Sequence, residues 1–78
     1  MADYLERLKK VVIAELGVTE DRIVAEASFR DDLGANSQKI FDLILALEDE
    51  FGIEVPDEDA LMITTIGDAS AYLQKRLG

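Results

Sequence analysis

Cysteine, histidine and tryptophan are all absent from this chain of 78 residues. Without cysteine and histidine the chain has no disulfides, no thiolate nucleophile, no zinc site of the usual kind and no imidazole to act as a general base. We therefore expect no catalytic residue, no metal site and no enzyme activity in the chain itself.

Long apolar runs and basic residues are also scarce. No stretch approaches the roughly 20 apolar residues that span a bilayer, and the first residues lack a basic and apolar signal pattern, so we expect a cytoplasmic protein without membrane insertion. The 8 Lys and Arg against 17 Asp and Glu give a net charge of -9. A charge of this sign repels nucleic acid and favours a basic protein partner.

The composition is otherwise that of a small folded domain, which we place over residues 1–78. Hydrophobic residues make up 49% and charged residues 32% of the chain, with one proline. The negative charge is concentrated between Ile40 and Ile63, where there are acids and no Lys or Arg. An acidic run of this kind is either a solvated face that keeps the protein soluble or a docking surface. The acids are Asp42, Glu48, Asp49, Glu50, Glu54, Asp57, Glu58 and Asp59.

Apolar residues at helical spacing predict two long helices. The first covers Asp3 to Leu16 and ends at Gly17; the second runs from Asn36 or Ser37 to about Phe51 and ends at Gly52. The expected buried residues of the first helix are Leu5, Leu8, Val12 and Leu16. Those of the second are Ile40, Leu43, Ile44, Leu47 and Phe51.

Two shorter helices follow. Pro56 and the acids after it indicate a third helix of one to two turns. Thr65 and Asp68 have the spacing of a capping box, with Asp in place of Glu, and they open a last helix. The expected buried residues of this helix are Ile66, Ala69, Leu73 and Leu77. No segment alternates as a strand over a useful length, so the fold class is all-α: a four-helix bundle with a long first connection and a short third helix.

The connection from Gly17 to Asn36 is unusually long for a compact domain. We expect apolar side chains to anchor it on the core and residues 28–31 to form a single capped turn. The anchors are Val18, Ile23, Val24, Phe29 and Leu33.

Ser37 stands at the start of the second helix and just ahead of the acidic run. A serine in this place is ordinarily a helix cap. A hydroxyl at the edge of an acidic surface is also well placed to be modified by an enzyme, and the remainder of the chain offers little chemistry of its own.

Several motifs together resemble the acyl carrier protein family over nearly the whole chain, from about Tyr4 to Leu77. They are Ala27-Ser28-Phe29, Asp32-Leu33-Gly34-Ala35-Asn36-Ser37, Leu45-Ala46-Leu47-Glu48-Asp49-Glu50-Phe51, Glu54-Val55-Pro56-Asp57-Glu58 and Ile63-Thr64-Thr65. The resemblance implies that Ser37 carries 4'-phosphopantetheine, donated by coenzyme A through a carrier-protein synthase (phosphopantetheinyl transferase). The protein would then shuttle acyl groups, as thioesters, between enzymes of fatty acid or related biosynthesis.

The resemblance also implies partner contacts and a place for the acyl chain. Acyl-transferring and acyl-modifying enzymes are expected to dock their basic patches on Asn36, Gln38, Asp42, Glu48, Asp49 and Glu54. The acyl chain is expected between the second and third helices, among Phe29, Leu47, Phe51, Leu61 and Ile63. The last five could equally be ordinary core residues. The charged surface indicates a monomer.

The chain departs from the family pattern around the serine. The commonest motif is Asp-Ser-Leu, where this chain has Asn36, Ser37 and Gln38, followed by Lys39 where an acid is frequent. Leu61 and Met62 stand where relatives often carry charge, and one of the two is expected to be exposed. These changes suggest a specialised carrier, for a specialised lipid or a polyketide. An aminoacyl or peptidyl carrier and an unmodified acidic docking or regulatory module remain alternatives.

Overall fold

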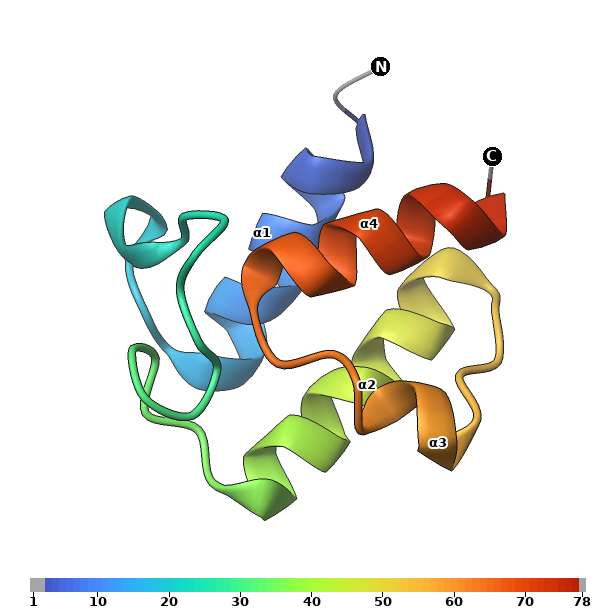
Figure 1. Cartoon of the computed structure of the whole chain (residues 1–78). Coiled ribbons are helices and arrows are strands. Elements are labelled where there is room, and N and C mark those ends of the chain that lie inside the picture. The colour runs from blue at the N-terminus through green and yellow to red at the C-terminus, as the bar shows by residue number, and fades with distance from the viewer. Residues whose placement is uncertain (1–2, 78) are drawn as a thin grey trace.

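The computed structural model describes residues 3–77, and within them the chain forms four α-helices (Figure 1). They are α1 (Asp3–Leu16), α2 (Ser37–Phe51), α3 (Asp57–Ala60) and α4 (Ile66–Leu77), with a short 3-10 helix, η1 (Glu20–Arg22), between α1 and α2. Apart from an isolated antiparallel bridge between Ser28 and Thr65, no strand pairing occurs among these residues. The all-α fold with a short third helix is confirmed.

The helices enclose one apolar core. Helix α1 packs against α2 and α4, and α3 lies beside α2, below the second half of α4 in the view of Figure 1. The centre of the core holds the fully buried side chains of Leu8, Val12, Leu43, Phe29 and Leu73. These residues come from α1, α2, α4 and the connection, so all four segments are held by the same contacts.

Polar contacts close the bundle at the outer end of α1. The Arg7 guanidinium forms an ion pair with Glu50, Nε to Oε2 2.9 Å, and lies 4.6 Å over the centre of the Phe51 ring. The Tyr4 hydroxyl donates to the Leu77 carbonyl, 3.4 Å away. The beginning of α1 is thereby tied to the ends of both α2 and α4.

The long connection is pinned as expected by Ile23, Phe29 and Leu33, all buried. The expected turn is present: Ser28 Oγ accepts from the Asp31 amide at 3.2 Å. The connection also joins the entry to α4, because the Phe29 amide donates to the Thr64 carbonyl at 3.0 Å.

Two side chains expected in the core are not there. Val24 is 51% exposed, next to the buried Ile23 that follows η1, and Leu5 of α1 is 38% exposed. Val18, Leu16, Ile40 and Leu77 are only partly buried. The helical spacing identified the inner face of each helix correctly, but the predicted face was one residue too wide.

The helices are short on the scale of a membrane. The longest, α2, has 15 residues, whereas a bilayer span needs roughly 20. Within residues 3–77 no helix is both long and apolar enough to cross a membrane.

Candidate functional site

Ser37 is the first residue of α2, and its neighbour performs the capping. Asn36 has extended backbone angles, and its Oδ1 accepts from the Lys39 amide at 2.9 Å. The Asn36 carbonyl accepts from the Ile40 amide, also at 2.9 Å. Because Asn36 is the N-cap, the exposed Ser37 hydroxyl is not needed to satisfy the backbone there.

The bend before α2 fixes where that hydroxyl lies. Gly34 takes a left-handed conformation with φ of 72°, which favours glycine, and the buried Ala35 donates its amide to the Phe29 carbonyl at 2.8 Å. With Phe29 deep in the core, the start of α2 is held firmly against the connection. The position of Ser37 is therefore set by a bend that is bonded to the connection.

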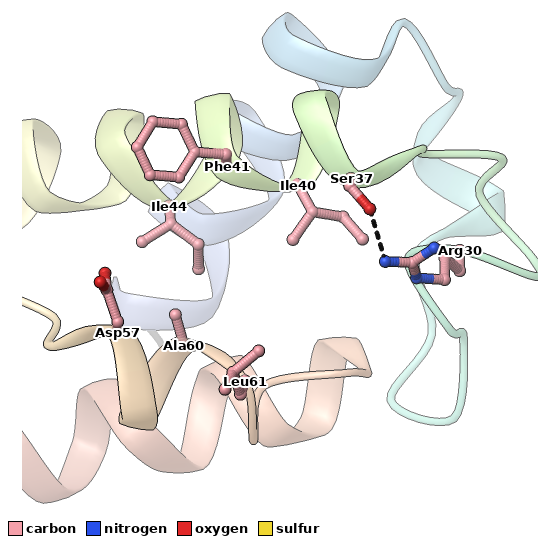
Figure 2. A pocket seen from close by; sticks show the side chains of 8 residues that line it. All are labelled: Arg30, Ser37, Ile40, Phe41, Ile44, Asp57, Ala60 and Leu61. Atoms are coloured by element: carbon pink, nitrogen blue, oxygen red, sulfur yellow. Dashed lines mark hydrogen bonds between the residues drawn. The ribbon is translucent and has the colours of Figure 1, made fainter.

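Arg30 faces Ser37 from the connection. Its Nη2 donates to the Ser37 Oγ at 2.8 Å, across the space between the connection and the first turn of α2 (Figure 2). No motif or spacing predicted this contact, although Arg30 is the one basic residue between Arg22 and Lys39. A positive charge and the N-terminal end of a helix both meet any anion attached to this oxygen.

A groove of about 420 Å³ opens beside Ser37, between α2 and α3. Ile40, Phe41 and Ile44 line it from α2, and Ala60 and Leu61 face them from the other side (Figure 2). Arg30 and Ser37 complete the lining at one end and Asp57 at the other. The walls are therefore apolar, with the hydroxyl at the rim.

A second hollow, of about 390 Å³, adjoins the groove. The two share Arg30, Ile40, Ala60 and Leu61 in their linings. The second hollow extends to Ile63 and to the entry of α4.

The five residues expected around an acyl chain separate into two groups. Leu61 lines the groove and Ile63 lines the second hollow. Phe29, Leu47 and Phe51 are buried in the core and line neither space. Helical periodicity distinguishes the inner face of a helix from its outer face, but it does not tell which residues between the two faces contact α3. The half-buried Ile40 and the exposed Phe41 lie between the two faces of α2, and the sequence did not predict them as pocket residues.

More apolar surface is exposed near the groove than the sequence indicated. Both Leu61 and Met62 point outward, at 81% and 76% exposure, where one of the two was expected. They follow α3 directly, which ends at Ala60. Phe41 and Leu45 are about half exposed on α2.

The six residues expected to contact partners lie at the surface with different roles. Asn36, Gln38, Asp49 and Glu54 are exposed, and Asp42 and Glu48 are half-buried. Gln38 Nε2 donates to Asp42 Oδ1 at 3.1 Å, and Glu48 Oε2 accepts from the Val55 amide at 2.7 Å. Glu48 thus supports the loop after α2. In the described part of the chain no three acidic side chains are placed to hold a metal ion.

The site fits a phosphopantetheine group. It offers an exposed hydroxyl for the ester bond, the N-terminal end of α2 and the Arg30 guanidinium for the phosphate charge, and an apolar groove beside them. The hydroxyl and the helix end belong to α2, the guanidinium belongs to the connection, and the groove lies between α2 and α3.

Comparison with known proteins agrees with this geometry. Residues 6–73 match the model of a family described as the phosphopantetheine attachment site, the point to which 4'-phosphopantetheine is bound. The solved structure of the acyl carrier protein from Enterococcus faecalis superposes with a TM-score of 0.79 at 34% sequence identity, covering 94% of this chain and 92% of that one. The chain therefore belongs to the phosphopantetheine-attachment family and is a carrier protein with the acyl carrier protein fold.

Proposed function

We propose that Ser37 carries the 4'-phosphopantetheine group and that the protein shuttles acyl intermediates between enzymes of fatty acid or related acyl biosynthesis. The observation that carries the proposal is the exposed hydroxyl at the first residue of α2, left without a capping role by Asn36, at the rim of an apolar groove. When bound, the group supplies a terminal thiol that holds an acyl group as a thioester.

The attachment step needs a partner enzyme. The contact made by the Ser37 hydroxyl is with Arg30, whose guanidinium stays protonated and cannot accept the serine proton. A serine hydroxyl is a weak nucleophile without a base, so the transferase must supply one. Ser37 Oγ then forms a bond to the phosphorus next to pantetheine in coenzyme A, the bond from that phosphorus to the nucleotide breaks, adenosine 3',5'-bisphosphate leaves, and the serine proton passes to the enzyme's base.

The chain's own residues favour the product of this step. The N-terminal end of α2 stabilises a phosphodiester by about 0.3 to 1 kcal/mol. The apolar walls of the groove, formed by Ile40, Phe41, Ile44 and Leu61, offer shelter for the part of an acyl chain nearest the attachment point. A polar intermediate gains little from these walls.

The acidic surface suits a carrier that must leave each enzyme quickly. The exposed carboxylates of Asp49 and Glu54 are proposed to meet basic patches on partner enzymes, together with Asp42. Such contacts are individually weak and screened by salt, so they speed encounter without slowing release. The same charge opposes self-association, which supports a monomer. A cytoplasmic location stays a prediction.

The test is the intact mass of the protein before and after incubation with coenzyme A and a broad-specificity phosphopantetheinyl transferase. We expect a gain of about 340 Da, the mass of the group from its chemical formula. Ser37→Ala abolishes the gain, whereas the matched control Ser70→Ala, which alters a serine of α4, retains it.

An absence of any gain from folded protein, also found unmodified in its native host, overturns the proposal. In that case an unmodified docking module becomes the better interpretation of the acidic surface. Circular dichroism of each variant shows that the protein is folded.

A further inference from the structure

The arginines in the described part of the chain donate to different kinds of acceptor. Arg7 pairs with the Glu50 carboxylate, and Arg22 donates to the Asp32 carbonyl. Arg76 donates to the Glu54 carbonyl and the Tyr72 hydroxyl. Like Arg22 and Arg76, Arg30 has no carboxylate among residues 3–77 within 4.0 Å of its guanidinium; what sets it apart is that its acceptor, at 2.8 Å, is Ser37 Oγ, the proposed attachment atom.

A hydroxyl is a poor counterpart for a guanidinium. It is neutral, and its one oxygen cannot match the two parallel donors that an arginine presents. A phosphate offers several oxygens and a full negative charge, and bonds of this charge-assisted kind are roughly twice as strong as neutral ones. Arg30 is thus placed to bind an anion at Ser37, and the unmodified serine does not supply one.

The position of that anion follows from the bond between Ser37 and the phosphate. In a phosphoserine ester the phosphorus is bonded directly to Oγ, the atom that Arg30 already contacts. Arg30 lines both the groove and the second hollow, and in the groove it lies at the same end as Ser37 (Figure 2). An anion held there lies at the entrance to the apolar walls.

We propose that Arg30 is a positioning residue that binds the phosphodiester once Ser37 is modified and holds it at the groove end of the site. The inference rests on the proposed function, since it requires the group to be attached at Ser37. It adds a second anchor beside the helix end, on a segment outside α2. Arg30 acts on the bound phosphate and takes no part in removing the serine proton.

The experiment compares unmodified and modified forms of four proteins: wild type, Arg30→Gln, Arg30→Lys and Lys39→Gln. Lys39→Gln is the matched control, because it removes the same charge two residues after Ser37, while its Nζ reaches toward the Glu15 carbonyl at 3.5 Å and does not line the groove. Intact mass first verifies that each modified protein carries the group. The readouts are the change in Tm on modification and the ³¹P resonance of the phosphodiester.

We expect modification to raise the Tm of the wild type by about 2 to 4 °C more than that of Arg30→Gln, a modest effect because the pair is exposed. The chemical shift of the ³¹P resonance in Arg30→Gln is expected to differ from that in the wild type. In Arg30→Lys, which keeps the charge and loses the planar guanidinium, the shift should lie between those of the wild type and Arg30→Gln. Lys39→Gln should behave as the wild type. The difference should fade in 1 M NaCl.

Equal Tm changes and equal ³¹P resonances in wild type and Arg30→Gln overturn the inference. Equal effects of Arg30→Gln and Lys39→Gln also overturn it, because they indicate a general loss of positive charge. Failure of the wild type to gain the group at all is detected by mass alone and counts against the proposed function instead.

Discussion

Asn36 caps α2, and Ser37 keeps its hydroxyl free for modification; one serine could not do both. A serine used as an N-cap has its oxygen committed to a backbone amide, whereas here Asn36 accepts that bond from Lys39 and leaves the Ser37 oxygen outside the helix. Replacement of the commoner aspartate by asparagine preserves the cap and removes one negative charge beside the proposed attachment point.

Asp68 is the residue whose charge matters most to the start of α4. Its Oδ2 accepts from the Thr64 hydroxyl at 2.9 Å and from the Thr64 and Thr65 amides at 3.2 Å each. The Asp68 amide in turn donates to Thr65 Oγ1 at 3.1 Å, so the expected capping box is confirmed. These bonds, the one from the Thr64 hydroxyl first, hold the Asp68 pKa below its ordinary value of 3.8.

This lowered pKa predicts a pH dependence of stability. The unfolded chain binds the Asp68 proton at higher pH than the folded chain, so the contribution is present in full above 3.8 and is lost as the pH falls through the folded value. We expect Asp68→Asn to lower the free energy of unfolding at pH 7 by about 0.5 to 1 kcal/mol.

Urea unfolding of both proteins at pH 7 and at pH 3 measures this effect. The difference in the free energy of unfolding between wild type and Asp68→Asn should be smaller at the lower pH, where the wild-type carboxyl takes up its proton. Asp49→Asn, at an exposed acid of α2, serves as the control for the loss of one charge. A gap that stays the same at both pH values contradicts the prediction.

Helix α3 depends on α4 for its position. With four residues it is too short to be stable alone. The Tyr72 hydroxyl donates to Asp59 Oδ2 at 2.8 Å, and Arg76 Nη1 donates to the Tyr72 oxygen and to the Glu54 carbonyl, both at 2.7 Å. Burial, followed by the bond to Asp59, raises the Tyr72 pKa above 10.0. Since α3 forms one wall of the groove, α4 sets that wall in place.

Tyr72→Phe removes the hydroxyl from this network and leaves the ring. We expect the free energy of unfolding to fall by about 0.5 to 1.5 kcal/mol, and the amides of residues 59–63 to exchange faster with solvent. Hydrogen exchange followed by NMR measures both the size and the place of the change. Tyr4→Phe, which loses only the 3.4 Å bond to the Leu77 carbonyl, should leave α3 unaffected. Unchanged exchange at α3 in Tyr72→Phe refutes the link.

The elements that the sequence predicted well are those with local signals. Helices α1, α2 and α4 have apolar residues at helical spacing and clear end signals, and their bounds agree with expectation. The 3-10 helix η1 was not predicted, because its three residues show no periodicity and the Thr19 side chain bonds to the Asp21 carboxylate and does not cap the backbone. The position of Ser37 at the start of α2 followed from the helical spacing, and its attachment role stays a prediction. The contact with Arg30 was not predicted, because it depends on how the connection folds back.

The acidic run and the groove belong to the same part of the molecule. Residues 40–63 include most of α2 and all of α3, which form the groove walls, while Arg30 places a positive charge beside Ser37 and Lys39 directs its Nζ toward the Glu15 carbonyl. The whole chain measures only 28 × 27 × 19 Å. A basic enzyme surface docked on these acids would therefore reach Ser37 in the same encounter, and we expect the residues at the edge of the acidic run to help to select the partner.

Gln38 and Lys39 are expected to narrow the set of partners. Gln38 stands where the family more often has an apolar residue, and its side-chain amide donates to Asp42. Lys39 adds a positive charge at the edge of the surface on which we propose that basic patches dock. In a strain lacking its principal fatty acid carrier, we expect this protein to restore growth poorly. The double variant Gln38→Leu, Lys39→Glu should restore it better, because it frees Asp42 and reverses the charge.

Growth rate is the measurement, with the mass of the purified carrier showing that each protein is modified in the cell. Ser37→Ala in either background should abolish rescue, which ties any growth to the attached group. Normal growth with the wild-type chain contradicts the idea of a specialised carrier. Equal growth with the wild type and the double variant shows instead that the residues around Ser37 do not select partners, and that selection then lies with the remaining surface of α2 and α3.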